Sequence, residues 1–230
     1  MYKFKLLFPR MSRHKYQALF KAIGEKSAEL RKKTIMIIGA GGLGSTIADM
    51  LHREGLCLRI VDKDRIYFEE IQRLSLYEED DENKFKAKQI KKRLEMVDFK
   101  NKVRTFHEEL EKENAFLLDS ADLVIDCSNN LETMTLVGTH AKKKISLISC
   151  KYSGSEGAIF ISNKKHNYKE VADKFEKIKD IETNGIINAA CHFAAGIIVS
   201  QALKILVGES AEDNFITFDV WDNKVKKTKL

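Results

Sequence analysis

A glycine-rich loop constrains the fold of this chain more than any other feature of its sequence. Residues 37–45 read Ile-Ile-Gly-Ala-Gly-Gly-Leu-Gly-Ser and fit the pattern G-x-G-x-x-G. The β-branched run over residues 34–38 predicts a buried parallel strand directly before the loop, and the pattern over residues 46–54 predicts a helix directly after it. A strand, a glycine-rich loop and a helix in this order indicate nucleotide binding. The motif alone does not separate NAD, FAD and ATP.

Individual glycines in such a loop have separate tasks. Gly39 permits the tight turn, Gly41 lets the backbone approach a phosphate, and Gly44 lets the helix pack closely on the sheet. The helix N-terminus then offers N–H groups to the phosphates. Asp62 ends the next predicted strand, where an acidic side chain roughly 20 residues after the loop accepts hydrogen bonds from ribose hydroxyls. An aspartate there can also simply cap the following turn. We take Gly39, Gly41, Gly42 and Gly44 as nucleotide-binding residues, with Asp62 as the ribose ligand.

Strands alternate with helices along the rest of the chain. Further strands are expected over residues 56–61, 122–126 and 145–149, more alternating and antiparallel strands over 158–162 and 215–220, and helices over 84–96 and 189–207. This order predicts an α/β fold: a doubly wound, Rossmann-like, mostly parallel sheet with antiparallel C-terminal strands. We expect a single domain over 1–230, with a helical lead-in over 1–33 and a crossover loop over 163–188.

Composition excludes several classes of protein. Hydrophobic residues are 43% and charged residues 32% of the chain, as in ordinary soluble domains. The formal charge of +6 is spread along the sequence. The basic clusters over 84–93 and 224–229 are interpreted as a solvated helix face and a charged tail, so no nucleic-acid partner is expected. Polar residues interrupt the apolar stretch over 185–208, and no signal peptide is apparent. We therefore expect a cytoplasmic protein that does not associate with membranes.

The cysteines predict neither a disulfide framework nor a zinc site. Cys57, Cys127, Cys150 and Cys191 are widely spaced and form no C-x-x-C pair, so no zinc is expected. Cys191 opens the apolar helix predicted near the C-terminus. It can be a buried small hydrophobe, or a nucleophile whose pKa the helix N-terminus lowers. The sequence leaves both interpretations open.

Several motifs in this order resemble one family. They are GAGGLGS over 39–45, VDKD over 61–64, the pair Gln72-Arg73, Lys86, and VIDCSNN over 124–130. Together they resemble the ThiF/MoeB/HesA superfamily, adenylyltransferases related to the catalytic halves of ubiquitin-activating enzymes. The resemblance implies that ATP and Mg²⁺ are bound. It also implies that the C-terminal carboxylate of a small ubiquitin-like or sulfur-carrier protein is activated as an acyl-adenylate, and that the chain forms a homodimer or one half of a heterodimer.

The resemblance also assigns roles to single residues. Asp62 and Asp64 of the VDKD motif would belong to the nucleotide site, and Arg73 and Lys86 would contact the phosphates. Arg13 would match the family's N-terminal arginine, which reaches across the dimer to the partner's γ-phosphate, and Arg10 is the other candidate. Without the resemblance, Lys86 would be interpreted as a solvated residue, since its helix is rich in lysine.

Two positions depart from the family pattern. Asn129 stands where the family has the aspartate that coordinates magnesium, and Glu70 stands where the family has an asparagine. Magnesium prefers charged oxygen ligands. We therefore hypothesise that Glu70 or Asp126 supplies the negative charge that Asn129 lacks. The crossover segment also has no cysteine, which thioester- or persulfide-forming members tend to keep there.

Three functions fit this sequence. The leading prediction is an ATP-dependent adenylyltransferase acting on a carrier protein. The second is a non-catalytic nucleotide-binding member, or the inactive half of a heterodimer that lends Arg13 to its partner, and Asn129 favours it. The third is an NAD-dependent oxidoreductase, since the glycine loop and Asp62 would suit NAD equally well.

Overall fold

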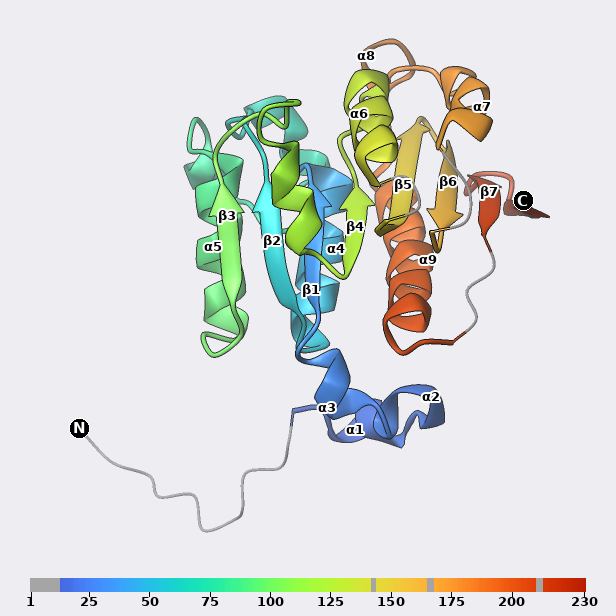
Figure 1. Ribbon diagram of the computed structural model, residues 1–230. Helices are drawn as coiled ribbons and strands as arrows, with labels where there is room; N and C mark the ends of the chain where they lie inside the picture. The colour runs from blue at the N-terminus through green and yellow to red at the C-terminus, as the bar shows by residue number, and fades with distance from the viewer. Residues whose placement is uncertain (1–12, 142–143, 165–167, 210–212) are drawn as a thin grey trace.

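Eight strands form one sheet in the part of the chain that the computed structural model describes, which comprises residues 13–141, 144–164, 168–209 and 213–230. The strand order is β3-β2-β1-β4-β5-β6-β7-β8. The strands are β1 Thr34–Ile38, β2 Cys57–Val61, β3 Val103–Phe106, β4 Leu123–Asp126, β5 Ser146–Ser153, β6 Glu156–Ser162, β7 Asn214–Asp219 and β8 Lys224–Lys229. Figure 1 shows the strands in colours that run from blue at the N-terminus to red at the C-terminus.

The pairing between neighbouring strands changes from parallel to antiparallel at β5. Strands β3, β2, β1, β4 and β5 are mutually parallel. From β5 onward each neighbour is antiparallel, through β6 and β7 to β8. In β1, Ile37 is paired with Ile60 on one side and Ile125 on the other, so apolar side chains of three strands share a face. The predicted fold class is confirmed, and so are the antiparallel strands expected over 158–162 and 215–220.

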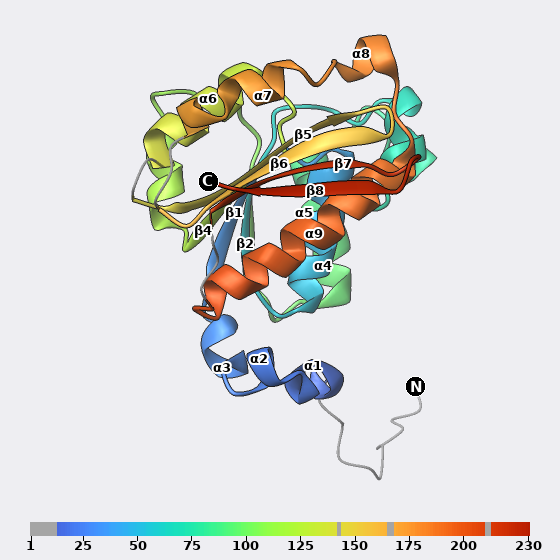
Figure 2. The ribbon, with the colours of Figure 1, turned by 90° about the vertical axis from the view of Figure 1, so that its right-hand side faces the viewer.

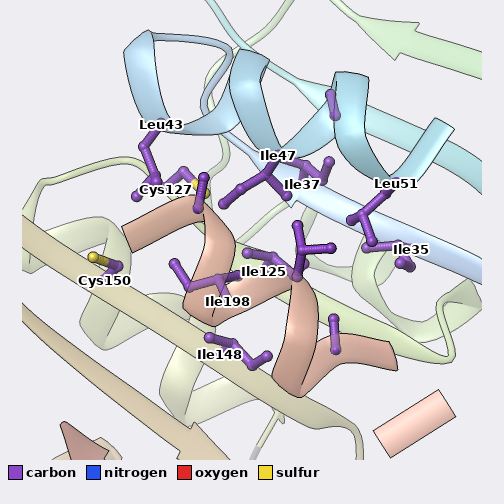
Figure 3. Packing of buried hydrophobic residues seen from close by; sticks show 14 of the residues in the cluster. Ile35, Ile37, Leu43, Ile47, Leu51, Ile125, Cys127, Ile148, Cys150 and Ile198 are labelled. Atoms are coloured by element: carbon purple, nitrogen blue, oxygen red, sulfur yellow. The ribbon is translucent and has the colours of Figure 1, made fainter. Parts of the chain in front are cut away.

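Helices cover both faces of this sheet. On one face lie α4 (Gly42–Arg53), α5 (Lys86–Val97) and α9 (Asn188–Leu206), and on the other lie α6 (Leu131–Ala141) and α7 (Ala172–Glu176) (Figures 1 and 2). A buried cluster fills each interface, as is usual for a doubly wound sheet. Figure 3 shows the first cluster, where Ile47 of α4 and Ile198 of α9 meet the sheet residues Ile37, Ile125 and Ile148.

Helix α9 is the one described helix that is long and apolar enough to cross a membrane, judged by length and composition alone. Its inward face, which includes Ala190, Ala194 and Ile198, is buried. That face packs on α4 and on strands β5 and β6. A core helix of a globular fold has the same length and composition as this one.

The expected helical lead-in before β1 consists of three short helices among the described residues. They are α1 Lys15–Leu19, α2 Lys21–Gly24 and α3 Ser27–Leu30, and they lie beyond the amino end of β1 (Figure 1). Only Ile23 and Leu30 of these helices are buried. Residues 1–12, and with them Arg10, lie outside the described residues.

Four segments differ from the sequence-based expectation. The crossover over 163–188 contains the 3-10 helix η4 (Tyr168–Glu170), α7, and α8 (Ile181–Asn184). The supposed charged tail is the edge strand β8, whose residues are all exposed. Strand β3 and helix α6 were not expected. Their patterns are weak because only Val103 of β3 is fully buried, and because α6 contains Thr, Val and Gly, which have low helix propensity.

Candidate nucleotide site

A pocket of about 600 Å³ opens at the carboxyl ends of β1, β2 and β4. In a doubly wound sheet, ligands bind at this edge, where the chain winds away in opposite directions from β1 and β4. The volume is within the usual range for small-molecule sites. The lining residues are Ile38, Gly39, Gly41, Gly42, Val61, Asp62, Lys63, Asp64, Glu70, Arg73, Lys86, Glu108, Glu109, Leu110, Cys127, Ser128, Asn129, Asn130, Leu131, Glu132, Thr133, Tyr152, Asp180, Ile181 and Glu182.

The glycine loop forms one wall of the pocket. Gly39 has φ +90°, a conformation that favours glycine. A Cβ on Gly44 would lie 1.9 Å from the carbonyl oxygen of Gly39, so α4 could not begin so close to β1 with any side chain there. A Cβ on Gly42 would lie 3.0 Å from the backbone oxygen of Arg73, whereas a Cβ on Gly41 would meet nothing within 4 Å. Gly39 and Gly44 thus have the turn conformation and the close packing that the loop pattern predicts.

Asp62 joins the loop to the end of β2. Its Oδ2 accepts the Ala40 N–H at 2.6 Å, and its Oδ1 accepts the Asp64 N–H at 2.7 Å. Burial raises the pKa of this carboxyl, and the Ala40 N–H and the charge of Lys86 act in the opposite direction. Each oxygen keeps a further lone pair for a ribose hydroxyl. Asp64 also lines the pocket, and its backbone oxygen accepts the Lys86 N–H at 2.9 Å.

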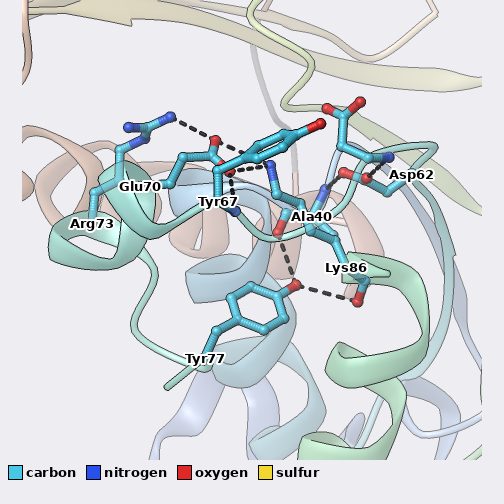
Figure 4. Close-up of polar contacts among 8 residues, drawn as sticks. Ala40, Asp62, Tyr67, Glu70, Arg73, Tyr77 and Lys86 are labelled. Carbon is cyan, nitrogen blue, oxygen red and sulfur yellow. Dashed lines mark hydrogen bonds and ion pairs between the residues drawn. The ribbon is translucent and has the colours of Figure 1, made fainter. Parts of the chain in front are cut away.

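Two cations and one carboxylate form an ion-pair cluster at the pocket wall (Figure 4). Arg73 ends the 3-10 helix η1 (Phe68–Arg73), and Lys86 opens α5. Glu70 contacts both, with its Oε1 2.8 Å from Arg73 Nη2 and its Oε2 2.7 Å from Lys86 Nζ. The structure buries Lys86 at the same pocket wall as Arg73, although the lysine-rich helix alone would favour a solvated residue.

The residues considered for magnesium do not form a metal site in this structure. The Oδ1 of Asn129 accepts the Tyr152 N–H at 2.9 Å, so β5 uses it. Asp126 is fully buried, and its Oδ1 accepts the Ser128 N–H at 3.0 Å. Glu70 is paired with the two cations. Among the described residues, no group of three or more His, Cys, Asp or Glu side chains could hold a metal ion.

Arg13 lies far from the pocket of its own chain. Its guanidinium is 2.8 Å from an oxygen of Asp98 and donates to the backbone oxygen of Val97 at 2.8 Å. Both partners are at the C-terminal end of α5, whereas Lys86 opens that helix. Because α5 has 12 residues, a helix rise of about 1.5 Å per residue places Arg13 roughly 18 Å from Lys86. The structure does not bring Arg13 together with the other predicted site residues.

Cys191 is buried beneath the glycine loop. Its Sγ lies 3.2 Å from the position of a Cβ on Gly42 and donates to the Tyr152 hydroxyl oxygen at 3.5 Å. Burial raises the pKa of this thiol, although the Tyr152 hydroxyl and the charge of Arg73 act in the opposite direction. These are the surroundings of a packed, buried thiol. The lower pKa that a helix N-terminus could give Cys191 is not found.

Sequence reasoning missed three parts of the pocket. One is the loop after β3, which supplies Glu108, Glu109 and Leu110. The N-terminus of α6 supplies four lining residues, 130–133, and Asn130 Oδ1 accepts the Thr133 N–H at 2.9 Å. Asparagine is a preferred N-cap residue, so Asn130 in front of this helix is a signal that could have been found. The crossover supplies Asp180, Ile181 and Glu182. It is tied to β5 through Lys151, whose Nζ donates to the backbone oxygen of Ile178 at 2.8 Å, and no short motif announces that contact.

Known proteins similar to this chain share its motifs and its fold. A family model described as the ThiF family matches residues 14–230. The sulfur carrier protein ThiS adenylyltransferase of Bacillus subtilis is 32% identical over 221 residues, which cover 92% of this chain and 66% of that protein. The sulfur carrier protein adenylyltransferase of Thermus thermophilus is 31% identical over 134 residues, which cover 57% of this chain and 49% of that protein. The chain thus spans about half to two thirds of the length of these relatives.

Solved structures agree on the fold. The crystal structure of E. coli MccB with MccA-N7isoASN has a TM-score of 0.80 at 15% identity, covering 97% of this chain and 72% of that chain. The structure of PaaA has a TM-score of 0.76 at 20% identity, covering 98% of this chain and 76% of that chain. At such identities the likeness concerns the fold alone. The family match extends from the lead-in helices to the last strand and includes the glycine loop, Asp62, Arg73 and Lys86, and we conclude that this chain belongs to the ThiF family.

Proposed function

We propose that this chain is an adenylyltransferase that uses ATP to activate the C-terminal carboxylate of a small ubiquitin-like or sulfur-carrier protein. One observation carries the proposal. A single pocket holds a glycine-lined helix N-terminus, the buried carboxylate of Asp62 and the two cations Arg73 and Lys86. These are the groups that would bind phosphates, ribose and a departing pyrophosphate. The names of the Bacillus and Thermus relatives support the choice of a carrier protein.

The reaction needs positioning and charge neutralisation more than acid or base catalysis. A carboxylate oxygen of the carrier attacks the α-phosphorus of ATP, and the bond from that phosphorus to the bridging oxygen of the β-phosphate breaks. The electron pair of the broken bond leaves with pyrophosphate. Lys86 and Arg73 would neutralise the charge that develops on this leaving group. Magnesium would enter as part of the ATP substrate and lower the charge of the triphosphate.

The carrier tail would enter the pocket beside the crossover. Asp180, Ile181 and Glu182 line the pocket on that side, and Lys151 holds the segment against the sheet. A narrow, extended C-terminal tail could pass beneath such a segment more easily than a folded surface could. This supports a carrier whose flexible end reaches the α-phosphate while its body remains outside.

We also propose that two copies of the chain associate. Tyr16, Leu19 and Phe20 of the lead-in are exposed at 76%, 73% and 63%. Neighbouring exposed aromatic and aliphatic side chains of this size are typical of association surfaces. Arg13 precedes them, so association would carry it toward the pocket of the second copy. Such a pair would be a homodimer, or a heterodimer in which the second chain is a related protein.

A binding and product assay tests the proposed function. ATP is titrated into the purified protein by calorimetry, with NADH in parallel, and the protein is then mixed with ATP, Mg²⁺ and a sulfur-carrier protein. We expect ATP binding, no NADH binding, and a carrier–AMP adduct with free pyrophosphate, detected by mass spectrometry. Gly41→Ala places a methyl group in the open space beside the loop and should abolish ATP binding in a folded protein. NADH binding without ATP binding would refute the proposal.

A non-catalytic, nucleotide-binding role is the second candidate. The observation that favours it is Asn129, which stands where the resemblance places an acidic magnesium ligand and whose Oδ1 accepts the Tyr152 N–H instead. The same assay separates the two roles. ATP binding without any carrier–AMP adduct, for carriers that other family members adenylate, would support the non-catalytic role.

A further inference from the structure

Glu70 occupies the space between the two cations that would hold phosphates. Its Oε1 accepts from Arg73 Nη2 at 2.8 Å and from Lys86 Nζ at 3.0 Å, and its Oε2 lies 2.7 Å from Lys86 Nζ. Figure 4 shows the carboxylate between the guanidinium and the ammonium group. Arg73 and Glu70 share η1, whereas Lys86 belongs to α5. The carboxylate therefore links two elements of the pocket wall.

Burial makes these contacts stronger than ordinary surface ion pairs. The exposed fractions of the side chains are 4% for Lys86, 14% for Glu70 and 17% for Arg73. Charges shielded from water interact at a lower effective dielectric constant. Among the described residues, Glu70 is the one carboxylate within 4.0 Å of either cation. The cluster thus carries one net positive charge, where the two cations alone would carry two.

We propose that Glu70 is an internal competitor for the polyphosphate site, so that a polyphosphate binds to Arg73 and Lys86 by displacing the Glu70 carboxylate. The proposal rests on the proposed function, because that function assigns the two cations to phosphates. A ligand with one phosphate has only a single group with which to replace the several contacts that the Glu70 carboxylate makes to Arg73 and Lys86. A chain of two or three phosphates spans both cations and replaces all of these contacts. Glu70 therefore selects for polyphosphates.

The competitor also acts at the end of the reaction. When pyrophosphate begins to leave, the Glu70 carboxylate is close enough to return to the two cations. Its return restores the buried ion pairs, so Arg73 and Lys86 are not left without partners. A buried charge without a partner is costly. Glu70 therefore weakens the binding of pyrophosphate and favours its release.

The test measures metal-free binding to matched variants. ATP and inorganic pyrophosphate are each titrated by calorimetry, with a chelator present, into the wild type, Glu70→Gln, Glu70→Asn and Glu69→Gln. Glu69 is exposed in the same short helix, so Glu69→Gln removes the same charge without touching the cluster. We expect Glu70→Gln to bind both ligands about tenfold or more tightly than the wild type. Glu69→Gln should remain within about twofold. Thermal unfolding verifies that each variant is folded, and Glu70→Asn provides a second reading.

Each other outcome overturns one proposal. Metal-free affinities that are unchanged or weaker in folded Glu70 variants refute internal competition. If a parallel titration with Mg–ATP shows weaker binding to the Glu70 variants while metal-free binding is unchanged, internal competition is also refuted and Glu70 is a metal ligand. If ATP binds to none of the proteins, the proposed function fails. Pyrophosphate would then still report whether Glu70 competes for the two cations.

Discussion

Gly44 lies where the first turn of α4 passes the end of β1, and the fold has no room for a side chain there. A Cβ would lie 1.9 Å from the Gly39 carbonyl oxygen, which belongs to the backbone and cannot rotate away. We expect Gly44→Ala to lower the free energy of unfolding by about 1–3 kcal/mol, as overpacking does. Gly41→Ala is the control, since its Cβ meets nothing within 4 Å. Urea unfolding measures both, and equal losses in the two variants would contradict the close-packing argument.

Asp126 gives the stability of this protein a defined pH dependence. Complete burial raises its pKa to about 6, and the Ser128 hydrogen bonds only partly oppose this. The folded state therefore holds the proton more tightly than the unfolded state, in which the carboxyl has its ordinary pKa of about 4. This contribution to stability is complete below pH about 4 and is lost as the pH rises through about 6. At neutral pH the cost is on the order of 3 kcal/mol.

The variant Asp126→Asn tests this linkage because asparagine does not titrate. Its free energy of unfolding, measured in urea at several values between pH 4 and 7.5, should rise relative to that of the wild type as the pH increases. The difference should change most between about pH 4 and pH 6. Asp222→Asn, at an exposed position, controls for the loss of a charge. Parallel profiles for Asp126→Asn and the wild type would show that Asp126 titrates alike in the folded and unfolded states.

Single residues could be predicted from the sequence where a motif fixes the backbone around them. The glycines and Asp62 follow from the loop pattern because the turn leaves few alternatives. Lys86 was identifiable only through the family resemblance, because its burial depends on the placement of α5 against the pocket. The pairing of Glu70 with Arg73 and Lys86 could not be predicted, since it depends on how η1 and α5 approach each other in space.

Elements with a strong pattern were predicted, and elements with a weak one were not. Strand β1 and helix α9 are buried along a continuous apolar run or stripe, which the sequence records directly. Strand β8 is exposed on every residue and is held by its backbone pairing with β7. Such a strand leaves no periodic signal, and its lysines are typical of a protected sheet edge. Helix α6 was missed because its Thr, Val and Gly residues have low helix propensity and give a weak pattern.

Lys151 is expected to hold the crossover in place. Its Nζ lies 2.9 Å from Asp180 Oδ1, and its side chain is 3% exposed. Replacing it with methionine keeps the apolar stem and removes the donor. We expect Lys151→Met to increase amide hydrogen exchange in α8 by about tenfold or more while β5 remains protected. Lys224→Met, which removes an exposed pair with Asp222, is the control. Unchanged exchange in α8 would mean that other contacts hold the segment.

At the scale of the whole molecule, the position of Arg13 distinguishes two architectures. Within one chain, the length of α5 separates Arg13 from Lys86 by about 18 Å. Arg13 therefore either serves only to anchor the lead-in to Asp98, or it completes the pocket of a second copy. In a symmetric dimer each pocket would then need Lys86 from one chain and Arg13 from the other.

Mixing two defective variants decides between these architectures. If Arg13 acts across the dimer, Arg13→Ala and Lys86→Ala should each bind ATP weakly on their own. In a mixture of equal amounts, allowed to exchange subunits, half of the dimers contain one chain of each kind, and each of these has one intact pocket. Calorimetry should then find about a quarter of all pockets with wild-type affinity for ATP. A mixture that binds no more ATP than its separate components, or an Arg13→Ala protein that binds ATP normally, would make Arg13 an anchor of the lead-in. The pocket would then be complete within one chain.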